Sequence, residues 1–261
     1  MSLRIEIVIP ARLASTRLPE KLLLRETGKS VLRHTFEAAS QATIPQGITV
    51  AVDSQRVLQE VESFGGRAVM TDPALPSGTD RVAVIARELT HVDAFINVQG
   101  DEPEIPVEAI DGVARLLTKH PDADIATLAT PIRQRDRLLD PACVKVVCDH
   151  AGRALYFSRS AIPHARLWDD QLLDQTPPHW LHHLGIYGYR RDLLLRMNEI
   201  PTSPLEQLEK LEQLRFLQAG CKIVVGTIAH APKGIDTLED YQAFVSRHRS
   251  KLVKSNGAEC R

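Results

Sequence analysis

Short apolar runs alternate with amphipathic segments along the first half of the chain. The apolar runs are three to six residues long and rich in β-branched residues, as is typical of buried strands; they lie at residues 4–9, 48–52, 68–70, 94–98 and 125–130. Between them, apolar residues recur at helical spacing, at residues 31–42, 54–64, 79–89 and 107–117. Strands that alternate with helices of this length predict βαβ units and a mainly parallel sheet.

The second half of the chain is less regular. Two apolar runs, at residues 144–148 and 154–157, flank a polar stretch that contains Gly152; this pattern predicts a hairpin, so we expect a mixed sheet there. Residues 168–180 are polar and contain proline, which favours a loop or an arm. The remaining pattern predicts strands at 184–189 and 222–228, helices at 191–197, 205–219 and 238–248, and a frayed tail at 251–261.

This order of elements predicts an α/β fold with a mixed, mainly parallel sheet flanked by helices. The 261 residues suffice to bury a full core without disulfide bonds. No repeat, low-complexity segment or linker interrupts the chain. We therefore expect a single domain over residues 1–250, with an inserted arm or small lobe at about 150–190.

Composition and charge exclude several classes of protein. Apolar residues make up 43% and charged residues 25% of the chain, which excludes disordered, collagen-like and fibrous proteins. The 32 basic and 33 acidic side chains give a net charge of −1, so bulk charge does not hold this chain on nucleic acid. Any phosphate group must therefore bind at a local site.

Cysteine usage and hydropathy lead us to expect a cytoplasmic protein with reduced thiols. The four cysteines, Cys143, Cys148, Cys221 and Cys260, include no CxxC pair, and so few do not make a disulfide framework in a chain of this length. The first apolar run ends at Pro10 and is too short for a signal peptide. No apolar run approaches the roughly 18 residues of a membrane span.

The segment that follows the first predicted strand is cationic. Residues 10–21 hold Arg12, Arg17 and Lys21 together with two hydroxyl side chains. Ligands of open α/β sheets bind outside the carboxyl ends of strands, where an arginine fork and a lysine point charge suit phosphate. The segment is not a Walker loop, because GxxxxGK[ST] is absent. From the loop alone, a phosphate site and a solvated basic loop are equal interpretations.

Two aspartates also follow predicted strands. Asp101, in the run NVQGDEP, comes directly after the strand at 94–98, so it shares an edge of the sheet with the cationic loop if both strands are parallel. Asp236 follows the last strand in the run GIDT, where it could instead be only the N-cap of the last helix. Mg²⁺ takes one or two carboxylates together with phosphate oxygens. The two aspartates and the loop together favour a site for a metal ion and a nucleotide.

Two further patterns have a structural interpretation beside the functional one. The run PSGTDR at residues 76–81 opens a helix, and its N–H groups and hydroxyls either bind a base or a phosphate or only cap the helix. His179, His182 and His183 in HWLHH suggest zinc, but the HExxH acid is absent and no cysteine is near in sequence. Ordinary, partly buried histidines are the better interpretation.

Eight runs of residues, in order from Ile9 to Asp240, match those of one family. They are IPAR.AS.RLP.K, SGTDR, NVQGDEP, VKVV, ALYFSR, HLGIYGYR, SPLE..E.LEQLR and GIDT.ED. The chain thereby resembles the 3-deoxy-manno-octulosonate cytidylyltransferase (CMP-Kdo synthetase) family. NVQGDEP, HLGIYGYR and LEQLR are specific to that family, whereas PAR.AS.R alone indicates only the wider sugar cytidylyltransferase group.

The resemblance implies a fold, an activity and a set of site residues. The fold would be that of nucleotide-diphosphosugar transferases, assembled as a homodimer. The activity would be formation of CMP-Kdo and pyrophosphate from CTP and Kdo for lipopolysaccharide biosynthesis, with Mg²⁺ as cofactor and without nucleic acid or membrane as a partner. The implied nucleotide site is Pro10, Ala11, Arg12, Ser15, Arg17, Lys21, Ser77, Gly78, Arg81, Gln99 and Asp101, and the implied Kdo pocket is Arg159, His183, Tyr187, Glu212 and Gln213.

The implied reaction is an attack of the anomeric hydroxyl of Kdo on the α-phosphorus of CTP. Positioning and neutralisation of charge drive such a transfer. The resemblance makes Asp101 and Asp236 the Mg²⁺ ligands, and the metal would lower the pKa of the hydroxyl. Arg17 and Lys21 would stabilise the departing pyrophosphate, and Arg159 would clamp the Kdo carboxylate.

The chain departs from the family's pattern at two places in its nucleotide motifs. Glu20 and Leu22 replace the glycine and the second proline usual in RLPGKPL. A carboxylate beside Arg17 and Lys21 would oppose triphosphate binding if it pointed inward, and we expect it to point to solvent. PSGTD in place of QSGTE removes a glutamine side chain, so any base contact of that glutamine is lost or replaced.

Three other functions remain open at this stage. The nearest is a cytidylyltransferase for another 2-keto sugar acid, such as a sialic acid or an amino analogue of Kdo. A catalytically idle relative is the second, although retention of both aspartates with Arg17 and Lys21 argues against it. A zinc hydrolase built on HWLHH is a distant third.

Overall fold

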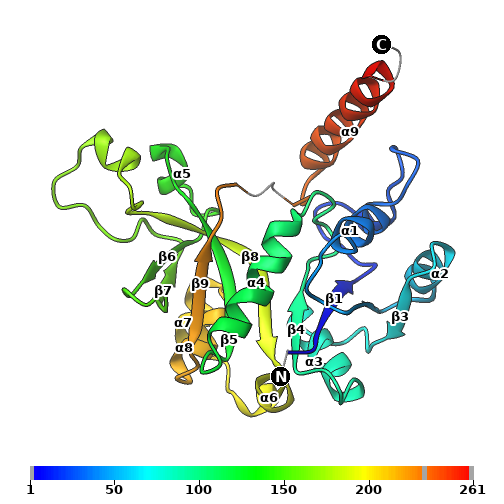
Figure 1. The fold of residues 1–261 in the computed structure, drawn as a ribbon, viewed down its shortest axis with the longest axis horizontal. Coiled ribbons are helices and arrows are strands. Elements are labelled where there is room, and N and C mark those ends of the chain that lie inside the picture. The colour runs from blue at the N-terminus through cyan, green and yellow to red at the C-terminus, as the bar shows by residue number, and fades with distance from the viewer. Residues whose placement is uncertain (1–2, 231–233, 259–261) are drawn as a thin grey trace.

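The computed structural model describes residues 3–230 and 234–258, and the strands of these residues form one nine-stranded sheet (Figure 1). The order of the main strands is β3-β2-β1-β4-β8-β5-β9, and β6 pairs with β7 and β8. The strands are β1 (Ile5–Ala11), β2 (Gly47–Val52), β3 (Arg67–Met70), β4 (Ala94–Asn97), β5 (Ile125–Pro131), β6 (Lys145–Cys148), β7 (Ala154–Ser158), β8 (Leu181–Arg190) and β9 (Ile223–Thr227).

The sheet is mixed and mainly parallel, as the sequence predicted. β1 pairs in parallel with β2 and β4, β2 with β3, and β5 with β9. β8 runs antiparallel to both β4 and β5, and the predicted hairpin is present as the antiparallel pair of β6 and β7. The parallel strands β1, β2 and β4 therefore end at one edge of the sheet, and the segments that follow them meet there.

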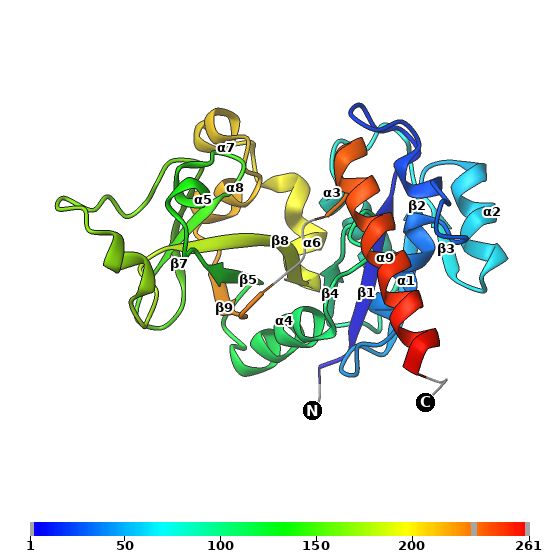
Figure 2. The ribbon, with the colours of Figure 1, turned by 90° about the horizontal axis from the view of Figure 1, so that it is seen from above.

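Helices cover both faces of the sheet (Figure 2). They are α1 (Val31–Ala39), α2 (Gln55–Ser63), α3 (Gly78–Glu88), α4 (Val107–Lys119), α5 (Arg135–Leu139), α6 (Arg191–Arg196), α7 (Pro204–Glu209), α8 (Gln213–Gln218) and α9 (Leu238–Ala258), with 3₁₀ turns η1 (Lys21–Leu23), η2 (Asp170–Asp174) and η3 (Met197–Glu199). Side chains of α1, α2 and α4 form one core, and those of α3, α6 and α8 form the other.

Burial on both faces explains why the first strand reads as a continuous apolar run. All seven residues of β1 are buried. Ile5, Ile7 and Ile9 belong to the core under α1, α2 and α4, while Val8 belongs to the core under α3. Such strands carry apolar residues at successive positions because helices cover both faces of a parallel sheet. The strand is therefore a rigid base for the loop that follows it.

The helix predicted at residues 205–219 is wrong, because the chain breaks there into α7 and α8. Lys210 has a left-handed backbone conformation, with φ of 53°. The break is held by Arg159, whose Nε donates to the carbonyl of Glu209 at 2.7 Å. It turns Leu211 and Leu214 into the second core, and this burial outweighs the local preference for a continuous helix.

The segment between β7 and β8 extends away from the sheet in both views (Figures 1 and 2). It lies inside the stretch at about 150–190 where the sequence predicted an arm. The sequence predicted a polar segment, but two of its residues, Leu173 and Trp180, are buried. They form a small separate core with Ile132, Leu138 and Cys143. Its end is thus attached to the domain by apolar contacts.

The last helix is longer than the sequence predicted. α9 runs to Ala258, past the predicted end at residue 248 and into the predicted frayed tail, while residues 259–261 lie outside the described part of the chain. Cys143, Cys148 and Cys221 are free thiols, and Cys143 and Cys221 are buried; Cys260 lies outside the described residues. Among the described residues, no helix is long and apolar enough to cross a membrane.

Candidate nucleotide and metal site

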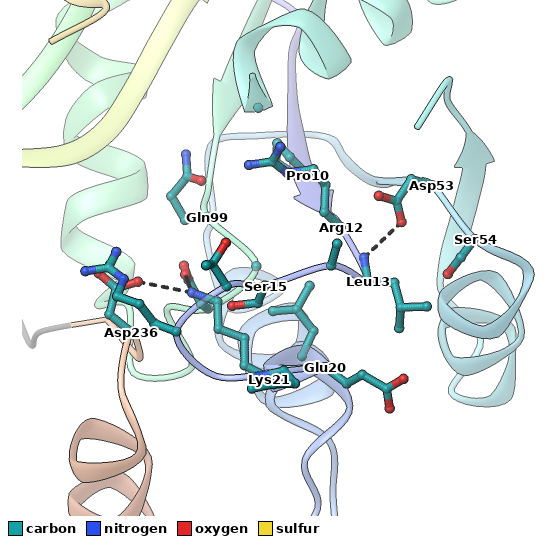
Figure 3. Close-up of a pocket in the computed structure, with 18 residues that line it drawn as sticks. Pro10, Arg12, Leu13, Ser15, Glu20, Lys21, Asp53, Ser54, Gln99 and Asp236 are labelled. Atoms are coloured by element: carbon teal, nitrogen blue, oxygen red, sulfur yellow. Dashed lines mark hydrogen bonds and ion pairs between the residues drawn. The ribbon is translucent and has the colours of Figure 1, made fainter. Parts of the chain in front are cut away.

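A pocket of about 910 Å³ opens at the edge where the parallel strands end (Figure 3). Its walls come from the loop after β1, the end of β2, the start of α3, the turn after β4 and the segment before α9. The lining residues are Pro10, Arg12, Leu13, Ala14, Ser15, Thr16, Arg17, Pro19, Glu20, Lys21, Leu22, Asp53, Ser54, Gly78, Gln99, Gly100, Asp101 and Asp236. The pocket has the size of a small-molecule site.

Most of the nucleotide-site residues expected from the sequence line this pocket. These are Pro10, Arg12, Ser15, Arg17, Lys21, Gly78, Gln99 and Asp101, joined by the second expected metal ligand, Asp236. Ala11, Ser77 and Arg81 are not among the lining residues: Ala11 and Arg81 are fully buried, and Ser77 caps α3 by accepting a hydrogen bond from the Asp80 N–H.

Asp53 holds the cationic loop in place, and sequence reasoning missed it. Its Oδ1 accepts a hydrogen bond of 2.9 Å from the Leu13 N–H, as the dashed line in Figure 3 shows. Asp53 directly follows β2, so the signal that identified Asp101, an acid placed just after a buried strand, would also have found Asp53. The neighbouring Ser54 caps α2 by accepting from the Val57 N–H.

Arg81 supports the loop from behind the pocket. Its guanidinium lies 3.6 Å from the Asp53 carboxylate and donates to the Thr71 hydroxyl at 2.5 Å and the Asp72 carbonyl at 3.1 Å. Burial lowers the pKa of Arg81, and the nearby Asp53 raises it. In this structure Arg81 therefore lies against Asp53, the residue that holds the loop, and its expected contact with the nucleotide stays a prediction.

The turn after β4 is packed directly against the end of β1. A Cβ on Gly100 would lie 3.0 Å from the Pro10 carbonyl oxygen, tighter than most Cβ contacts, so a larger residue here would have to push the turn away from the end of β1. The Thr35 hydroxyl donates to the Gly100 carbonyl at 2.9 Å. The Ile235 N–H donates to the Asp101 carbonyl at 2.8 Å, so the backbone holds the two aspartate segments together.

Lys21 lies between the two aspartates. Its ammonium forms an ion pair with Asp101, lies 3.2 Å from Asp236 Oδ1, and donates to the Ile235 carbonyl at 3.0 Å. Arg17 Nη2 contacts Asp236 Oδ2 at 2.9 Å. The sequence prediction that the loop and the two aspartates share one edge of the sheet is confirmed by these contacts.

The helix-cap interpretation of Asp236 is not supported. Thr237, the residue before α9, accepts through its hydroxyl from the Asp240 N–H at 3.2 Å, and Asp240 accepts in return from the Thr237 N–H at 3.1 Å. This reciprocal pair is a capping box. The Asp236 carboxylate instead faces Lys21 and Arg17 in the pocket.

The donor set at this point fits a hard divalent cation. One ammonium group reaches both carboxylates, so a single positive centre can be shared by Asp101 and Asp236. Mg²⁺ prefers oxygen ligands and completes a set of one or two carboxylates with phosphate oxygens and water. Among the described residues, no group of three or more histidine, cysteine or acidic side chains is placed to hold a metal.

One of the expected sugar-side residues, Glu212, meets the nucleotide side at the start of α3. Glu212 accepts from the Thr79 hydroxyl at 3.2 Å and from the Ser77 hydroxyl at 3.5 Å. Burial raises the pKa of Glu212. Ser77 and Thr79 flank Gly78, which lines the pocket. Glu212 therefore contacts the residues on both sides of a pocket-lining position.

Aromatic packing buries His183 and partly buries Tyr187, the two β8 residues of the expected Kdo set. The His183 ring lies 5.2 Å from the Tyr187 ring and 4.9 Å from the Phe157 ring, and its Nε2 lies 3.0 Å from the Thr127 hydroxyl. Burial, with a smaller contribution from His182, lowers the pKa of His183 to about 3. His183 is therefore a neutral hydrogen-bonding group at physiological pH.

Arg159 and Gln213 flank the break between α7 and α8. The Arg159 guanidinium donates to backbone carbonyls of Glu209, Pro141 and Lys210. Gln213 is only 5% exposed, so it does not lie on a solvated helix face.

Glu20, the departure from the family's glycine, points away from Lys21 and Asp236 (Figure 3). Its backbone is left-handed, with φ of 51°, a conformation that costs a side-chain-bearing residue about 1 kcal/mol. The Arg56 guanidinium binds both carboxylate oxygens and lowers the pKa of Glu20. The expectation of an outward-pointing carboxylate is confirmed, and the structure adds its partner.

Comparison with known proteins shows the family of the chain. A family model described as cytidylyltransferase matches residues 7–223. The chain is 52% identical over 246 residues to the 3-deoxy-manno-octulosonate cytidylyltransferase of Rhodopirellula baltica, with 94% of this chain and 98% of that protein covered. It is 40% identical over 244 residues to the protein of the same name from Leptospira interrogans, with 94% and 96% covered.

A solved structure supports the same assignment. It is described as CMP:2-keto-3-deoxy-manno-octonic acid synthetase complexed with CTP, and matches with a TM-score of 0.88 and 38% identity over 95% of this chain and 99% of that one. The fold implied by the sequence runs is thereby confirmed. On the evidence of its site, its fold and these matches, the chain belongs to the 3-deoxy-manno-octulosonate cytidylyltransferase family.

Proposed function

We propose that this chain transfers CMP from CTP to Kdo, giving CMP-Kdo and pyrophosphate for lipopolysaccharide biosynthesis, and that the pocket at the ends of β1 and β4 is its nucleotide site. The observation that carries the proposal is the contact of the Lys21 ammonium with both Asp101 and Asp236 inside a pocket of about 910 Å³. Cations and paired carboxylates at one strand edge are what a metal-bound triphosphate requires.

The loop residues bind and orient the triphosphate. Lys21 and Arg17 form charge-assisted contacts with acids in this structure, and both side chains can exchange these partners for phosphate oxygens. Asp101 and Asp236, released from Lys21, would hold Mg²⁺, which when bound neutralises phosphate charge and lowers the pKa of a nearby hydroxyl. No protein nucleophile is needed, because positioning and charge neutralisation suffice for this transfer.

The sugar-side residues orient Kdo for attack on the α-phosphorus. The contact of Glu212 with Ser77 and Thr79 supports a Kdo site that adjoins the nucleotide pocket at Gly78. Neutral His183 and the Tyr187 hydroxyl are suited to hydrogen bonds with sugar hydroxyls. Arg159 has guanidinium donors beyond its three backbone contacts and would bind the Kdo carboxylate.

The proposal also covers the assembly and the compartment. The segment between β7 and β8 extends from the sheet (Figure 1) and carries an exposed Leu167, which suits a homodimer contact. The reaction would take place in the cytoplasm, where CTP is made. Sedimentation analysis of the wild type and of Leu167→Asp tests the assembly; a wild-type monomer at micromolar concentration would refute it.

Pyrophosphate release tests the reaction itself. Purified protein is mixed with CTP and Mg²⁺, with Kdo or without it, and with sialic acid or an amino analogue of Kdo in parallel. The proposal expects release with Kdo and little release without it. Faster release with another 2-keto sugar acid would reassign the sugar, and no release with any acid would favour a catalytically idle relative.

Replacement of Asp101 tests the metal assignment. Asp101→Asn should abolish most turnover while leaving the fold intact, because a neutral amide is a weak Mg²⁺ ligand. Mg²⁺ binding in the presence of CTP, followed by calorimetry, gives a readout independent of turnover. An Asn variant with near wild-type turnover and Mg²⁺ binding would refute the assignment.

A further inference from the structure

The charges that line the nucleotide pocket do not favour a polyanion by themselves. Among the described lining residues, the three cations Arg12, Arg17 and Lys21 face four carboxylates. Two of the carboxylates, Asp101 and Asp236, are those proposed to hold Mg²⁺. The other two are Asp53 and Glu20, and each is neutralised by a group that does not line the pocket.

Arginines just outside the pocket supply that neutralisation. Arg81 lies 3.6 Å from Asp53. Arg56 binds Glu20 through both carboxylate oxygens, with Nη2 to Oε2 at 2.9 Å. Neither arginine is among the lining residues.

Arg56 lies on a helix that is anchored in the core. It is the second residue of α2, whose Val57 and Val61 are fully buried and whose N-cap is Ser54. The neighbouring acid on α2, Glu60, already pairs with Arg25 and accepts from the Ser30 hydroxyl at 2.6 Å. Glu20 is therefore the acid that Arg56 contacts on the pocket side of α2.

The conformation of Glu20 makes this partner necessary. The left-handed backbone places Glu20 in the tight turn that precedes Lys21, at a position where the family usually has glycine. Glu20 directly precedes Lys21 in the sequence, so its carboxylate is carried by the residue next to the lysine. If it were released, it would repel a triphosphate and compete with it for Lys21 and Arg17.

We propose that Arg56 is a positioning residue of the nucleotide site, which binds the Glu20 carboxylate and keeps its charge away from the triphosphate of CTP. This inference rests on the proposed function, because it takes CTP as the ligand. It differs from a role in stability: an ion pair between half-exposed side chains contributes little to folding, yet its loss leaves a full negative charge beside the phosphate site.

The test uses four proteins: wild type, Arg56→Gln, Glu20→Gln and the double variant. CTP binding in the presence of Mg²⁺ is measured by calorimetry at low and at high ionic strength, together with the Tm of each protein. Arg153→Gln is the matched control, since it also removes an arginine from an exposed ion pair, with Asp149 in the β6–β7 hairpin, which lies far from β1 in Figure 1.

Charge repulsion predicts a specific pattern among these variants. Arg56→Gln should weaken CTP binding about five- to tenfold at low ionic strength, and less at high ionic strength because salt screens exposed charges. Glu20→Gln should bind CTP at least as tightly as the wild type. The double variant should recover wild-type affinity, because no carboxylate is left to repel the nucleotide.

Other patterns would overturn the inference. Equal weakening in Arg56→Gln and in the double variant would make Arg56 itself a phosphate ligand. Weakening in all three variants would mean that the pair only fixes the loop. If the wild type binds CTP and Arg56→Gln binds it equally well, the role of Arg56 is refuted and the proposed function stands. If the wild type binds no CTP, the proposed function is refuted as well.

Discussion

Lys21 and Arg17, two of the three cations of the loop after β1, should differ sharply in their effect on CTP use. Lys21 has a side chain only 14% exposed and contacts Asp101, Asp236 and the Ile235 carbonyl. The Arg17 side chain is 68% exposed and forms an ion pair with Asp236. The perturbation is therefore a comparison of Lys21→Ala with Arg17→Ala, because burial sets the strength of a charge contact.

The magnitudes follow from the local dielectric. Two unit charges about 4 Å apart interact by about 4 kcal/mol at an effective dielectric constant near 20, and by about 1 kcal/mol in water. Lys21→Ala should thus lose about 2–4 kcal/mol of transition-state stabilisation, the range of a lost oxyanion donor. This corresponds to about a 30- to 1,000-fold fall in kcat/KM for CTP. Arg17→Ala should lose about 1 kcal/mol or less, or up to about fivefold.

Steady-state pyrophosphate release, with CTP and Kdo varied in turn, measures both effects. Lys222→Ala serves as the control, because Lys222 pairs with Asp122 at the surface at the start of β9. Both loop variants should change the CTP parameters far more than the Kdo parameters. Equal losses in Lys21→Ala and Arg17→Ala, or a loss confined to Kdo, would refute the reasoning from burial.

Three further perturbations test other parts of the site. Asp53→Ala should lower the free energy of unfolding in urea by about 3 kcal/mol, because it leaves the buried Arg81 guanidinium without the carboxylate beside it. Asp53→Asn should lose less CTP affinity than Asp53→Ala, because the amide keeps an acceptor for the Leu13 N–H. Equal CTP affinities of the two variants would contradict this. His183 has a folded-state pKa of about 3 against about 6.5 when unfolded, so the unfolded chain binds the extra proton and stability should fall as pH drops from 6.5 towards 3. His183→Gln should flatten that fall, and an unchanged pH dependence of the free energy of unfolding would show that His183 does not contribute. Gln213→Ala should raise the KM for Kdo and loosen discrimination among 2-keto sugar acids, because unpaired polar groups in a sugar pocket reject analogues; a loss of stability with unchanged Kdo parameters would make Gln213 a packing residue.

The amino-acid sequence alone was sufficient to predict the mixed sheet and many of the residues that line the pocket. Strand and helix periodicities are local properties of the sequence. The continuous apolar run of β1, for example, indicates a strand that is buried on both faces, as the structure has it. Once the strands are parallel, the segments that follow β1 and β4 must meet at one edge. The meeting of Lys21 with Asp101 follows from that topology, although 80 residues separate them.

The tertiary structure decided what depends on contacts between distant segments. Periodicity favoured a single helix where Arg159 and the burial of Leu211 break it into α7 and α8. Only the packed structure shows that Arg81, which the resemblance assigns to the nucleotide site, is buried against Asp53. The partner of Glu20 is 36 residues away on α2. These outcomes were not readable locally, because burial and ion pairing depend on which side chains the fold brings together, whereas periodicity and motifs describe only neighbours along the chain.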